Sequence, residues 1–361
     1  QERGGRGQAG VQRRAAAHGS SVEEYLSHRV TLSELDQSFE VEADETTLTA
    51  ALRANIHLPH DCKSGTCGTC RFKLLEGVVT YLAEPMALAP EEQAEGYALA
   101  CQAWPASDLV ASVEVLPALL REPTRHMAVV HQVEPLSPHV MRLVLRLPED
   151  VVLEYRPGQY VNIVLEDGSV RSFSMASRPD GQVIDFHIRR IPGGSFTEGR
   201  LSALAAGDNL HVEIPHGSFF LRKEDFRPLL MIATGTGLAP IKSILESLHD
   251  DPDCPPVTLY WGMRTEADLY LHTEIESWAE HLSDFRYIPV LSRAGDGWSG
   301  RRGHVQDAAS EDIEDFSEYA IYLCGSPEMV AASKRLFIAK GASINHIYAD
   351  SFFFQHNLNR R

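Results

Sequence analysis

At 361 residues, the chain is long enough for two or three domains of roughly 150 residues each. Its 43% hydrophobic and 23% charged residues are typical of globular proteins and exclude an extended disordered chain. Acidic residues outnumber basic ones by 50 to 33, which disfavours nucleic acid as a partner, and no apolar window is long enough to favour a membrane partner. No charged-then-apolar start marks a secretory signal, so we expect a cytoplasmic protein. Six cysteines are too few for a disulfide scaffold, so their spacing indicates metal or redox chemistry.

The first twenty residues are rich in Gly, Ala and Arg, with Glu2 as the only acid. They show no apolar periodicity, so residues 1–20 predict an unstructured leader. An Arg-rich, acid-poor leader is also typical of organelle transit peptides. The low Ser content and the missing amphipathic pattern make that the weaker alternative.

Residues 21–120 predict a small domain similar to a β-grasp. Alternating apolar residues predict a hairpin that turns near residues 34–37, and helical spacing behind a threonine cap predicts a helix over 47–55. Further strands are expected at 70–75 and 109–115. The domain carries 16 acidic and 5 basic residues, a net charge of −11, so a basic docking partner and a merely solvated surface are both open.

A linker at Pro117–Pro123 leads into a second predicted domain, residues 121–226. Its runs of alternating apolar and polar residues are separated by Pro and Gly turns, the pattern of an antiparallel sheet or barrel. Over residues 227–361 continuous apolar strands alternate with helices, which predicts a parallel, doubly wound sheet covered on both faces. The expected fold class is therefore a multidomain protein with α+β and α/β parts.

Four of the cysteines carry the most specific pattern in the chain. Cys62, Cys67 and Cys70 are spaced C-x4-C-x2-C and Cys101 follows alone, which is the spacing of a plant-type 2Fe-2S cluster. The cluster takes two thiolates per iron, and the glycines between the first three cysteines allow the loop to approach it closely. Zinc sites usually have two C-x2-C pairs, so zinc is the weaker alternative.

Further motifs follow the cysteines: R-S-F-S at 171–174, G-G-S-F-T at 193–197, G-T-G-L-A-P at 235–240 and C-G-S-P-E-M at 324–329. Together with the cysteine loop they resemble the ferredoxin-NAD(P)+ reductase superfamily. The most similar subgroup is the reductase components of multicomponent aromatic-ring, Rieske-type oxygenases, which carry an N-terminal plant-type ferredoxin domain. The resemblance covers roughly residues 21–354 and implies three domains that bind 2Fe-2S, FAD and NAD(P)H.

The resemblance places the flavin in the second domain. It implies that Arg171 pairs with the FAD pyrophosphate, that Phe173 lies along the flavin and that Ser174 hydrogen-bonds near flavin N5. Many relatives have Tyr where this chain has Phe173, so one hydroxyl contact is lost. The glycine pair leads into an expected helix start, where amides and the helix dipole suit a pyrophosphate. FMN is the weaker alternative, because FMN-binding relatives generally place the ferredoxin domain last. The implied FAD-binding residues are Arg171, Phe173, Ser174, Ile188, Arg189, Gly193, Gly194, Ser195, Phe196 and Thr197.

The resemblance places the nicotinamide nucleotide at the turns of the third domain. It implies that Cys324 lies near the nicotinamide with Met329 behind it, and that Phe352 covers the flavin where nicotinamide enters. A buried structural cysteine is the alternative for Cys324. Phe353 and Phe354 are expected only to pack. The implied nucleotide-binding residues are Gly235, Thr236, Gly237, Ala239, Pro240, Gly262, Arg264, Gly325, Ser326, Met329 and Phe352.

The choice between NADH and NADPH depends on charges near the adenosine ribose. Arg293, with Arg301 and Arg302 as helpers, stands where NADPH-using relatives hold the 2′-phosphate. Asp268, in the D-L-Y pattern, instead resembles NADH-using relatives. We therefore expect NADH to be favoured over NADPH.

The function implied by the resemblance is electron transfer. The nicotinamide delivers a hydride to flavin N5, and the 2Fe-2S cluster releases single electrons to a terminal oxygenase component or a ferredoxin. Ser174, Cys324 and Phe352 are the expected catalytic residues. Two alternatives stay open: a CDP-6-deoxyhexose-pathway reductase that passes electrons to a pyridoxamine-dependent dehydrase, and a redox-sensing electron-transfer subunit. We expect a monomer, with Cys254 as a surface thiol.

Overall fold

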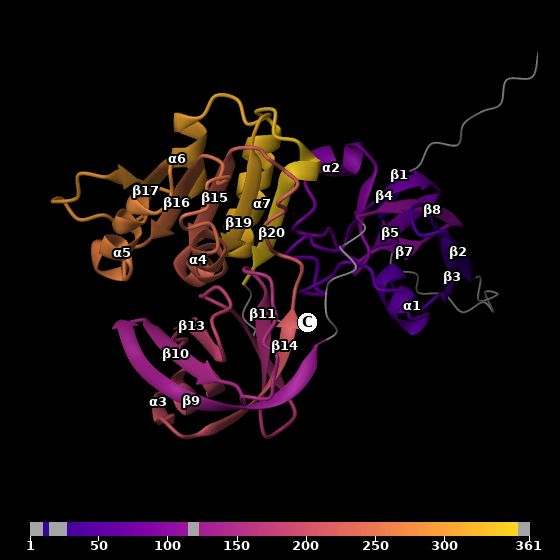
Figure 1. Cartoon of the computed structure of the whole chain (residues 1–361). Coiled ribbons are helices and arrows are strands. Elements are labelled where there is room, and N and C mark those ends of the chain that lie inside the picture. The colour runs from indigo at the N-terminus through magenta and orange to yellow at the C-terminus, as the bar shows by residue number, and fades with distance from the viewer. Residues whose placement is uncertain (1–9, 14–26, 115–122, 353–361) are drawn as a thin grey trace, which may run out of the picture. The chain divides into compact units, whose positions relative to one another are not determined.

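The computed structural model describes residues 10–13, 27–114 and 123–352. The chain divides into two compact units, Gln1–Leu120 and Arg121–Arg361. Figure 1 shows the first unit in indigo to purple and the second in magenta to yellow. Among the described helices, none has both the length and the apolar character needed to cross a membrane.

The first unit is built around a five-stranded sheet in the order β3-β2-β8-β4-β6. The strands are β2 (His28–Leu32), β3 (Gln37–Val41), β4 (Arg71–Glu76), β6 (Tyr97–Leu99) and β8 (Leu109–Val113). The helices are α1 (Thr47–Arg53) and α2 (Pro90–Ala94). The predicted hairpin is present as the antiparallel pair β2 and β3. Helix α1 begins after Thr46, whose side chain accepts a hydrogen bond from the amide of Thr49, as the threonine cap predicted.

A second, three-stranded sheet in this unit has the order β1-β5-β7. Strand β1 (Gly10–Arg13) pairs in parallel with β5 (Val78–Tyr81), which also pairs with β7 (Trp104–Pro105). The prediction of an unstructured leader is therefore wrong for Gly10–Arg13. Strand pairing uses backbone groups, so an open strand edge can take up a segment that has no apolar alternation. The rest of the predicted leader and most of the predicted linker lie outside the described residues.

The second unit begins with a six-stranded antiparallel sheet in the order β12-β11-β14-β9-β10-β13. Its strands are β9 (Thr124–Ser137), β10 (Val140–Arg146), β11 (Tyr160–Val164), β12 (Val170–Ser174), β13 (Val183–Arg189) and β14 (Asn209–His216). Helix α3 (Leu201–Ala203) follows β13. Just after β12, the amide of Ala176 donates to the carbonyl of Asp185 in β13 at 2.8 Å. The two outer strands of this sheet are therefore linked to each other.

The rest of the second unit is a six-stranded sheet in the order β18-β17-β16-β15-β19-β20, with every neighbouring pair parallel. Its strands are β15 (Leu229–Thr234), β16 (Val257–Met263), β17 (Phe285–Leu291), β18 (Arg301–Arg302), β19 (Ala320–Gly325) and β20 (Ile347–Ser351). Its helices are α4 (Leu238–Glu246), α5 (His272–Ser277), α6 (Val305–Asp312) and α7 (Pro327–Ile338).

Both faces of this parallel sheet are buried. On β15, Met231 lies in a core cluster with residues of α4 and α5, whereas its neighbour Ile232 lies in a second cluster with residues of α6 and α7. Successive side chains of a strand point to opposite faces, so the helices cover the sheet on both sides. This arrangement brings the turns after β15, β16, β19 and β20 to the carboxyl edge of the sheet, where ligands bind in open α/β sheets.

Candidate cofactor-binding sites

The four cysteines of the predicted cluster lie together in two pairs. Hydrogen bonding joins the thiols of Cys62 and Cys67, and likewise those of Cys70 and Cys101. Cys67, Cys70 and Cys101 are buried, and Cys62 is partly buried. A 2Fe-2S cluster takes two thiolates on each iron, so two adjacent thiol pairs match its ligand requirement.

Each thiol also receives a backbone amide. The amides of Ser64, Thr69 and Cys101 donate to the sulfurs of Cys62, Cys67 and Cys70 at 3.4 to 3.5 Å. The fourth sulfur, that of Cys101, accepts from the backbone of Gly65. Amides directed at sulfur stabilise thiolates, so the loop is arranged for anionic ligands before any metal binds.

Glycine is required in the cysteine loop for two physical reasons. Gly65 and Gly68 have φ values of +74° and +84°, in the left-handed region that favours glycine. A Cβ added to Gly65 would also lie 2.8 Å from the Gln102 side chain. The predicted role of these glycines, close approach of the loop, is thus supported by backbone conformation and by packing.

The thiol pKa values follow from the pairing. Hydrogen bonding to its partner lowers the pKa of Cys62 and of Cys101, and the same contacts raise the pKa of Cys67 and of Cys70. Within the described ranges, no group of three or more His, Cys, Asp or Glu side chains is arranged to hold a metal ion. The two thiol pairs match the two ligands that each iron of a 2Fe-2S cluster takes.

In the second unit, two of the predicted flavin motifs meet. From β12, the Arg171 guanidinium donates to the Ser195 hydroxyl at 3.5 Å, and the rings of Phe173 and Phe196 lie 5.5 Å apart between centroids. Ser174, the last residue of β12, is buried, and Phe173 is half-buried, as opposite faces of a strand require. These contacts place the R-S-F-S strand end next to the G-G-S-F-T turn.

The Gly193–Gly194 turn offers amides to an anion. Gly193 has a φ of +73° and open space where a Cβ would stand, and its amide donates to the Glu198 carboxylate. The Gly193 amide thus already contacts a carboxylate of its own turn, which is the kind of group an anion site would hold. A Cβ on Gly194 would lie 2.5 Å from the Thr197 hydroxyl, so Gly194 packs against the turn itself. The expected helix start is a six-residue π-helix, Ser195–Arg200, before α3.

The remaining predicted flavin residues line the end of β13. Ile188 is buried in the core of the antiparallel sheet, and Arg189 follows it. Burial and the charge of Arg264 lower the pKa of Arg189, while Asp268 has the opposite effect. Arg189 of the flavin strand and Arg264 of the nucleotide half thus lie within electrostatic reach of each other.

At the carboxyl edge of the parallel sheet, the predicted nucleotide turns pack directly on each other. A Cβ on Gly237 would stand 2.3 Å from the carbonyl oxygen of Cys324, and a Cβ on Gly325 would stand 2.1 Å from the Thr234 hydroxyl. The same hydroxyl accepts from the amide of Ser326 at 3.2 Å. Gly237 and Gly325 therefore allow the turns after β15 and β19 to pack against each other. This packing role is separate from the predicted role of glycine in letting a phosphate approach the backbone.

The other predicted residues of these turns cap a helix or pack in the core. Ser326 caps α7 by accepting from the amide of Met329, a residue of that helix whose side chain lies in the core. Ala239 and Pro240 are buried in α4, and Gly262 lies against Thr234 at the end of β15. The remaining residue, Thr236, lies in the short turn before α4.

Cys324 and Phe352 lie side by side at this edge. Cys324 is fully buried, and burial raises the pKa of its thiol well above the usual value, with Asp350 contributing. The amide of Phe352 donates to the carbonyl of Gly325 at 2.7 Å, which anchors the predicted lid next to Cys324. Sequence reasoning missed Asp350, which faces Cys324 in register across β19 and β20. Only the pairing of these distant strands reveals it.

Comparison with known proteins supports the same three parts. Three family profiles match the chain: "2Fe-2S iron-sulfur cluster binding domain" over residues 30–106, "Oxidoreductase FAD-binding domain" over 127–221 and "Oxidoreductase NAD-binding domain" over 231–335.

Relatives match over nearly the whole chain. A CDP-6-deoxy-L-threo-D-glycero-4-hexulose-3-dehydrase reductase of Yersinia pestis is 35% identical over 316 residues, 87% of this chain and 95% of that protein. The terephthalate 1,2-dioxygenase reductase component 1 of Comamonas sp. is 34% identical over 334 residues, 91% of this chain and 98% of that protein. The chain belongs to the family of iron-sulfur flavoprotein reductases. The crystal structure of the Amycolatopsis cytochrome P450 reductase GcoB agrees, with a TM-score of 0.67, 34% identity, and coverage of 90% and 98% of the two chains.

The protein is therefore an NAD(P)H-dependent oxidoreductase with a ferredoxin reductase-type fold. The predicted 2Fe-2S, FAD and NAD(P)H cofactors are confirmed by its three matching domains. The thiol pairs, the anion-binding turn after β13 and the glycine turns after β15 and β19 are the places in this reductase that fit them.

Proposed function

We propose that this reductase passes electrons from NADH to a terminal oxygenase component or a ferredoxin. When bound, FAD accepts a hydride from the nicotinamide and gives up electrons singly, and the 2Fe-2S cluster carries them onward. The observation that carries the proposal is the pairing of four thiols, each with a backbone amide, in the same chain as flavin and nucleotide domains.

We propose that Cys62, Cys67, Cys70 and Cys101 hold the cluster, one pair on each iron. The pairing of the thiols and the positive φ of the loop glycines support this assignment. The side chain of Gln102 donates to the carbonyl of Cys101 at 2.9 Å, which helps to fix the position of the fourth ligand.

In the flavin site, we propose that Arg171 and Ser195 bind the pyrophosphate together with the Gly193 amide. Their mutual contact and the anion already held by that amide support this role. Glu198 must then leave the amide when FAD binds, because two anions cannot share one donor. Phe173 would lie along the flavin, and Ser174 would hydrogen-bond near flavin N5.

At the nucleotide site, we propose that the Gly235–Gly237 turn holds the dinucleotide phosphates and that Cys324 lies at the nicotinamide. The raised pKa of Cys324 keeps its thiol protonated, so it contacts the ring as a neutral group. Phe352 excludes water from the flavin until the nicotinamide displaces it. Half-burial of Phe352 against the core beside Cys324 supports a ring that can move.

NADH is the proposed electron donor. Arg301 pairs with Asp312, and Arg302 donates to three backbone carbonyls, so these predicted helpers already have structural partners. That leaves Arg293 with few cations beside it for a 2′-phosphate. We expect kcat/KM for NADH to exceed that for NADPH by about tenfold or more, a difference of roughly 1.4 kcal/mol. Steady-state kinetics with both nucleotides tests this, and a preference for NADPH would refute it.

The electron acceptor has two candidates. An oxygenase component or ferredoxin is favoured by the relative that serves terephthalate dioxygenase, and a pyridoxamine-dependent dehydrase by the relative from Yersinia pestis. The net charge of −11 over residues 21–120 suits a basic acceptor surface in either case. Reconstitution with each purified acceptor, followed by product formation at two salt concentrations, separates the two.

The decisive test of electron transfer is cytochrome c reduction by the FAD- and cluster-loaded protein with NADH and with NADPH. The proposal predicts reduction with NADH at rates of at least about 1 per second, the low end of ordinary turnover. Absence of reduction with both nucleotides would overturn it and leave the redox-sensing alternative.

We further infer the finer architecture and setting of the chain. The five-stranded sheet with α1 suits a β-grasp over residues 21–120, and the link from Ala176 to β13 suits a closed barrel over 121–226. The nucleotide domain then occupies 227–361. None of the six cysteines forms a disulfide, which suits the reducing cytoplasm, and we propose that the protein acts there as a monomer.

A further inference from the structure

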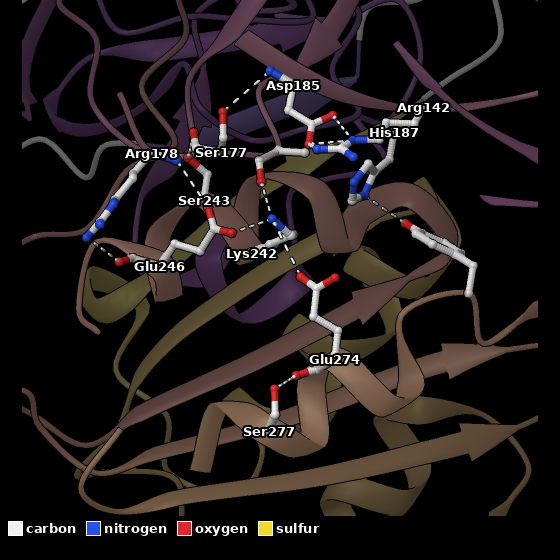
Figure 2. A network of polar contacts seen from close by, with 12 residues as sticks. Arg142, Ser177, Arg178, Asp185, His187, Lys242, Ser243, Glu246, Glu274 and Ser277 are labelled. Carbon is white, nitrogen blue, oxygen red and sulfur yellow. Dashed lines mark hydrogen bonds and ion pairs between the residues drawn. The ribbon is translucent and has the colours of Figure 1, made fainter. Parts of the chain in front are cut away.

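Lys242 is a buried charge that lies outside the proposed cofactor contacts. It lies on α4 with 6% of its surface exposed. Its ammonium group donates to the carbonyl of Ala176 at 3.2 Å, forms an ion pair with Glu246 one turn later, and lies 3.8 Å from the Glu274 carboxylate (Figure 2). Burying an ammonium group costs free energy unless it is paired and hydrogen-bonded, so we expect the loss of any one of these partners to destabilise the arrangement.

Neighbouring residues of α4 contact the same stretch of chain. The Ser243 hydroxyl donates to the carbonyl of Ser177 at 2.5 Å, and the amide of Arg178 donates to the Glu246 carboxylate at 3.3 Å (Figure 2). Positions 242, 243 and 246 face the same way on a helix. We call these three α4 residues, with the backbone of residues 176–178, the α4 clasp.

The clasp joins the two halves of the proposed hydride-transfer site. Its backbone side begins two residues after Ser174, the last residue of β12. Its helix side lies on α4, which begins directly after the Gly235–Gly237 turn. From Leu238 to Lys242 the helix rises only about 6 Å, since each residue adds about 1.5 Å. A short, rigid path therefore connects the flavin strand with the nucleotide turn.

The segment after β12 also has hydrogen-bond partners elsewhere in the second unit. Tyr155 donates to the carbonyl of Ser177 at 2.9 Å, and the amide of Asp185 donates to the Ser177 hydroxyl at 3.4 Å. Asp185 is itself held by Arg142 at 2.9 Å (Figure 2). The segment after β12 is thus fixed from the barrel side, and α4 is the element that fixes it from the nucleotide side.

We propose that Lys242 is a positioning residue for the reductase: through the clasp it sets the separation of Ser174 from the Gly235–Gly237 turn, and so the approach of nicotinamide to flavin. This inference rests on the proposed function of the site. Lys242 itself touches neither reactant, and it acts through the backbone of Ala176. Its loss therefore slows hydride transfer without removing a ligand of either cofactor.

The test compares Lys242→Met, which keeps the aliphatic stem, with Lys242→Arg, which keeps the charge. Lys340→Met is the matched control, because Lys340 also donates to backbone carbonyls in this unit, those of Ser310 and Ile313, but at the ends of α6 and α7. Hydrogen exchange on the FAD-loaded proteins without nucleotide reports the clasp directly. Anaerobic stopped-flow mixing with NADH reports the limiting rate of flavin reduction and the apparent Kd.

We expect Lys242→Met to speed exchange at the amides of residues 176–178 at least tenfold and to lower the limiting rate at least tenfold, with the NADH Kd within threefold of wild type. Lys242→Arg restores both values to within threefold, and Lys340→Met leaves them near wild type. Unchanged exchange in Lys242→Met, or equal losses in Lys242→Met and Lys340→Met, would overturn the proposal.

If Lys242→Met does not fold, Glu246→Gln provides the second variant. It retains the lysine and weakens the acceptor of the Arg178 amide, so exchange should rise at residue 178 in particular, and no rise there would count against the clasp. Hydrogen exchange needs no electron acceptor. A wild-type protein that fails to reduce cytochrome c would therefore refute the proposed function, while the exchange comparison still decides whether the clasp exists.

Discussion

The cysteine loop of the first unit and the glycine turns of the second present different atoms to their cofactors. The loop, together with Cys101, offers four thiols in two pairs, and backbone amides donate to their sulfurs. The turns after β13, β15 and β19 offer mainly backbone groups. The Gly193 amide contacts a carboxylate, and the glycines after β15 and β19 let two turns pack closely against each other. One substitution removes a cysteine ligand completely, and the cluster site then fails. A substitution in a turn that binds through its backbone only shifts the binding groups, so we expect a partial loss of binding.

The largest effect we predict is therefore in the first unit. Cys101→Ser removes one thiolate of the Cys70 pair, so the 2Fe-2S absorbance should disappear and cytochrome c reduction should fall by about 100-fold or more, roughly 2.7 kcal/mol. Ferricyanide reduction, which draws on the flavin, should survive. Absorbance spectra and the two acceptor assays check this. A retained cluster spectrum would show that Cys101 is not a ligand.

A graded effect is expected where turns touch. In Gly237→Ala the new Cβ would stand 2.3 Å from the Cys324 carbonyl oxygen, so one turn must shift. We expect kcat/KM for NADH to fall about 30-fold, roughly 2 kcal/mol, with the cluster spectrum intact. Gly295→Ala is the control, because a Cβ there meets nothing within 4 Å. Equal behaviour of the two variants would refute the contact.

A smaller effect is expected for the lid. Phe352→Ala removes a ring that the nicotinamide must displace, so NAD+ should bind about fivefold more tightly, close to 1 kcal/mol. Titration of the oxidised protein with NAD+ measures this. Weaker binding in the variant would mean that the ring supports the nucleotide and does not compete with it.

The last prediction concerns stability against pH and distinguishes the two units. His187 is buried in the second unit, and burial with the charges of Lys242 and Arg142 lowers its pKa well below the usual value. The unfolded chain then binds the proton more readily, so stability is full above about pH 6.5 and falls by up to about 1.4 kcal/mol per pH unit below it. In the first unit, none of the described histidines is buried.

His187→Gln removes this titration. The free energy of unfolding of the FAD-loaded protein, measured by urea denaturation between pH 5 and 8, should depend less steeply on pH in the variant below pH 6.5. The slope is compared and not the absolute stability, because the substitution also changes packing against Tyr270, whose ring lies 5.4 Å from that of His187. If the pH dependence of the unfolding free energy were unchanged in the variant, folding would not lower the pKa of His187.

How much the sequence could predict also differs between the regions. The cysteine spacing predicted which residues gather, and the apolar patterns predicted the parallel sheet and the turns at its edge, because both patterns are local. The loop glycines were predictable for the same reason. Strand β1 was not, since its pairing with β5 uses backbone groups that every residue has.

Contacts between distant segments escaped prediction as well. Asp350 faces Cys324 only because β19 and β20 pair, and Lys242 reaches Ala176 only because α4 packs on the segment after β12. Arg302 looked available for a phosphate but is engaged by carbonyls of its own loop. A single sequence reports residue types, and the partner of a charged side chain is fixed by tertiary packing.

The most direct test of the central claim is an anaerobic titration of the FAD- and cluster-loaded protein with NADH, followed by electron paramagnetic resonance. The account predicts that NADH alone produces the signal of a reduced 2Fe-2S cluster in the wild type and none in Cys101→Ser. A flavin that bleaches while the wild-type cluster stays oxidised would contradict electron transfer from the flavin to the cluster that these four cysteines would hold.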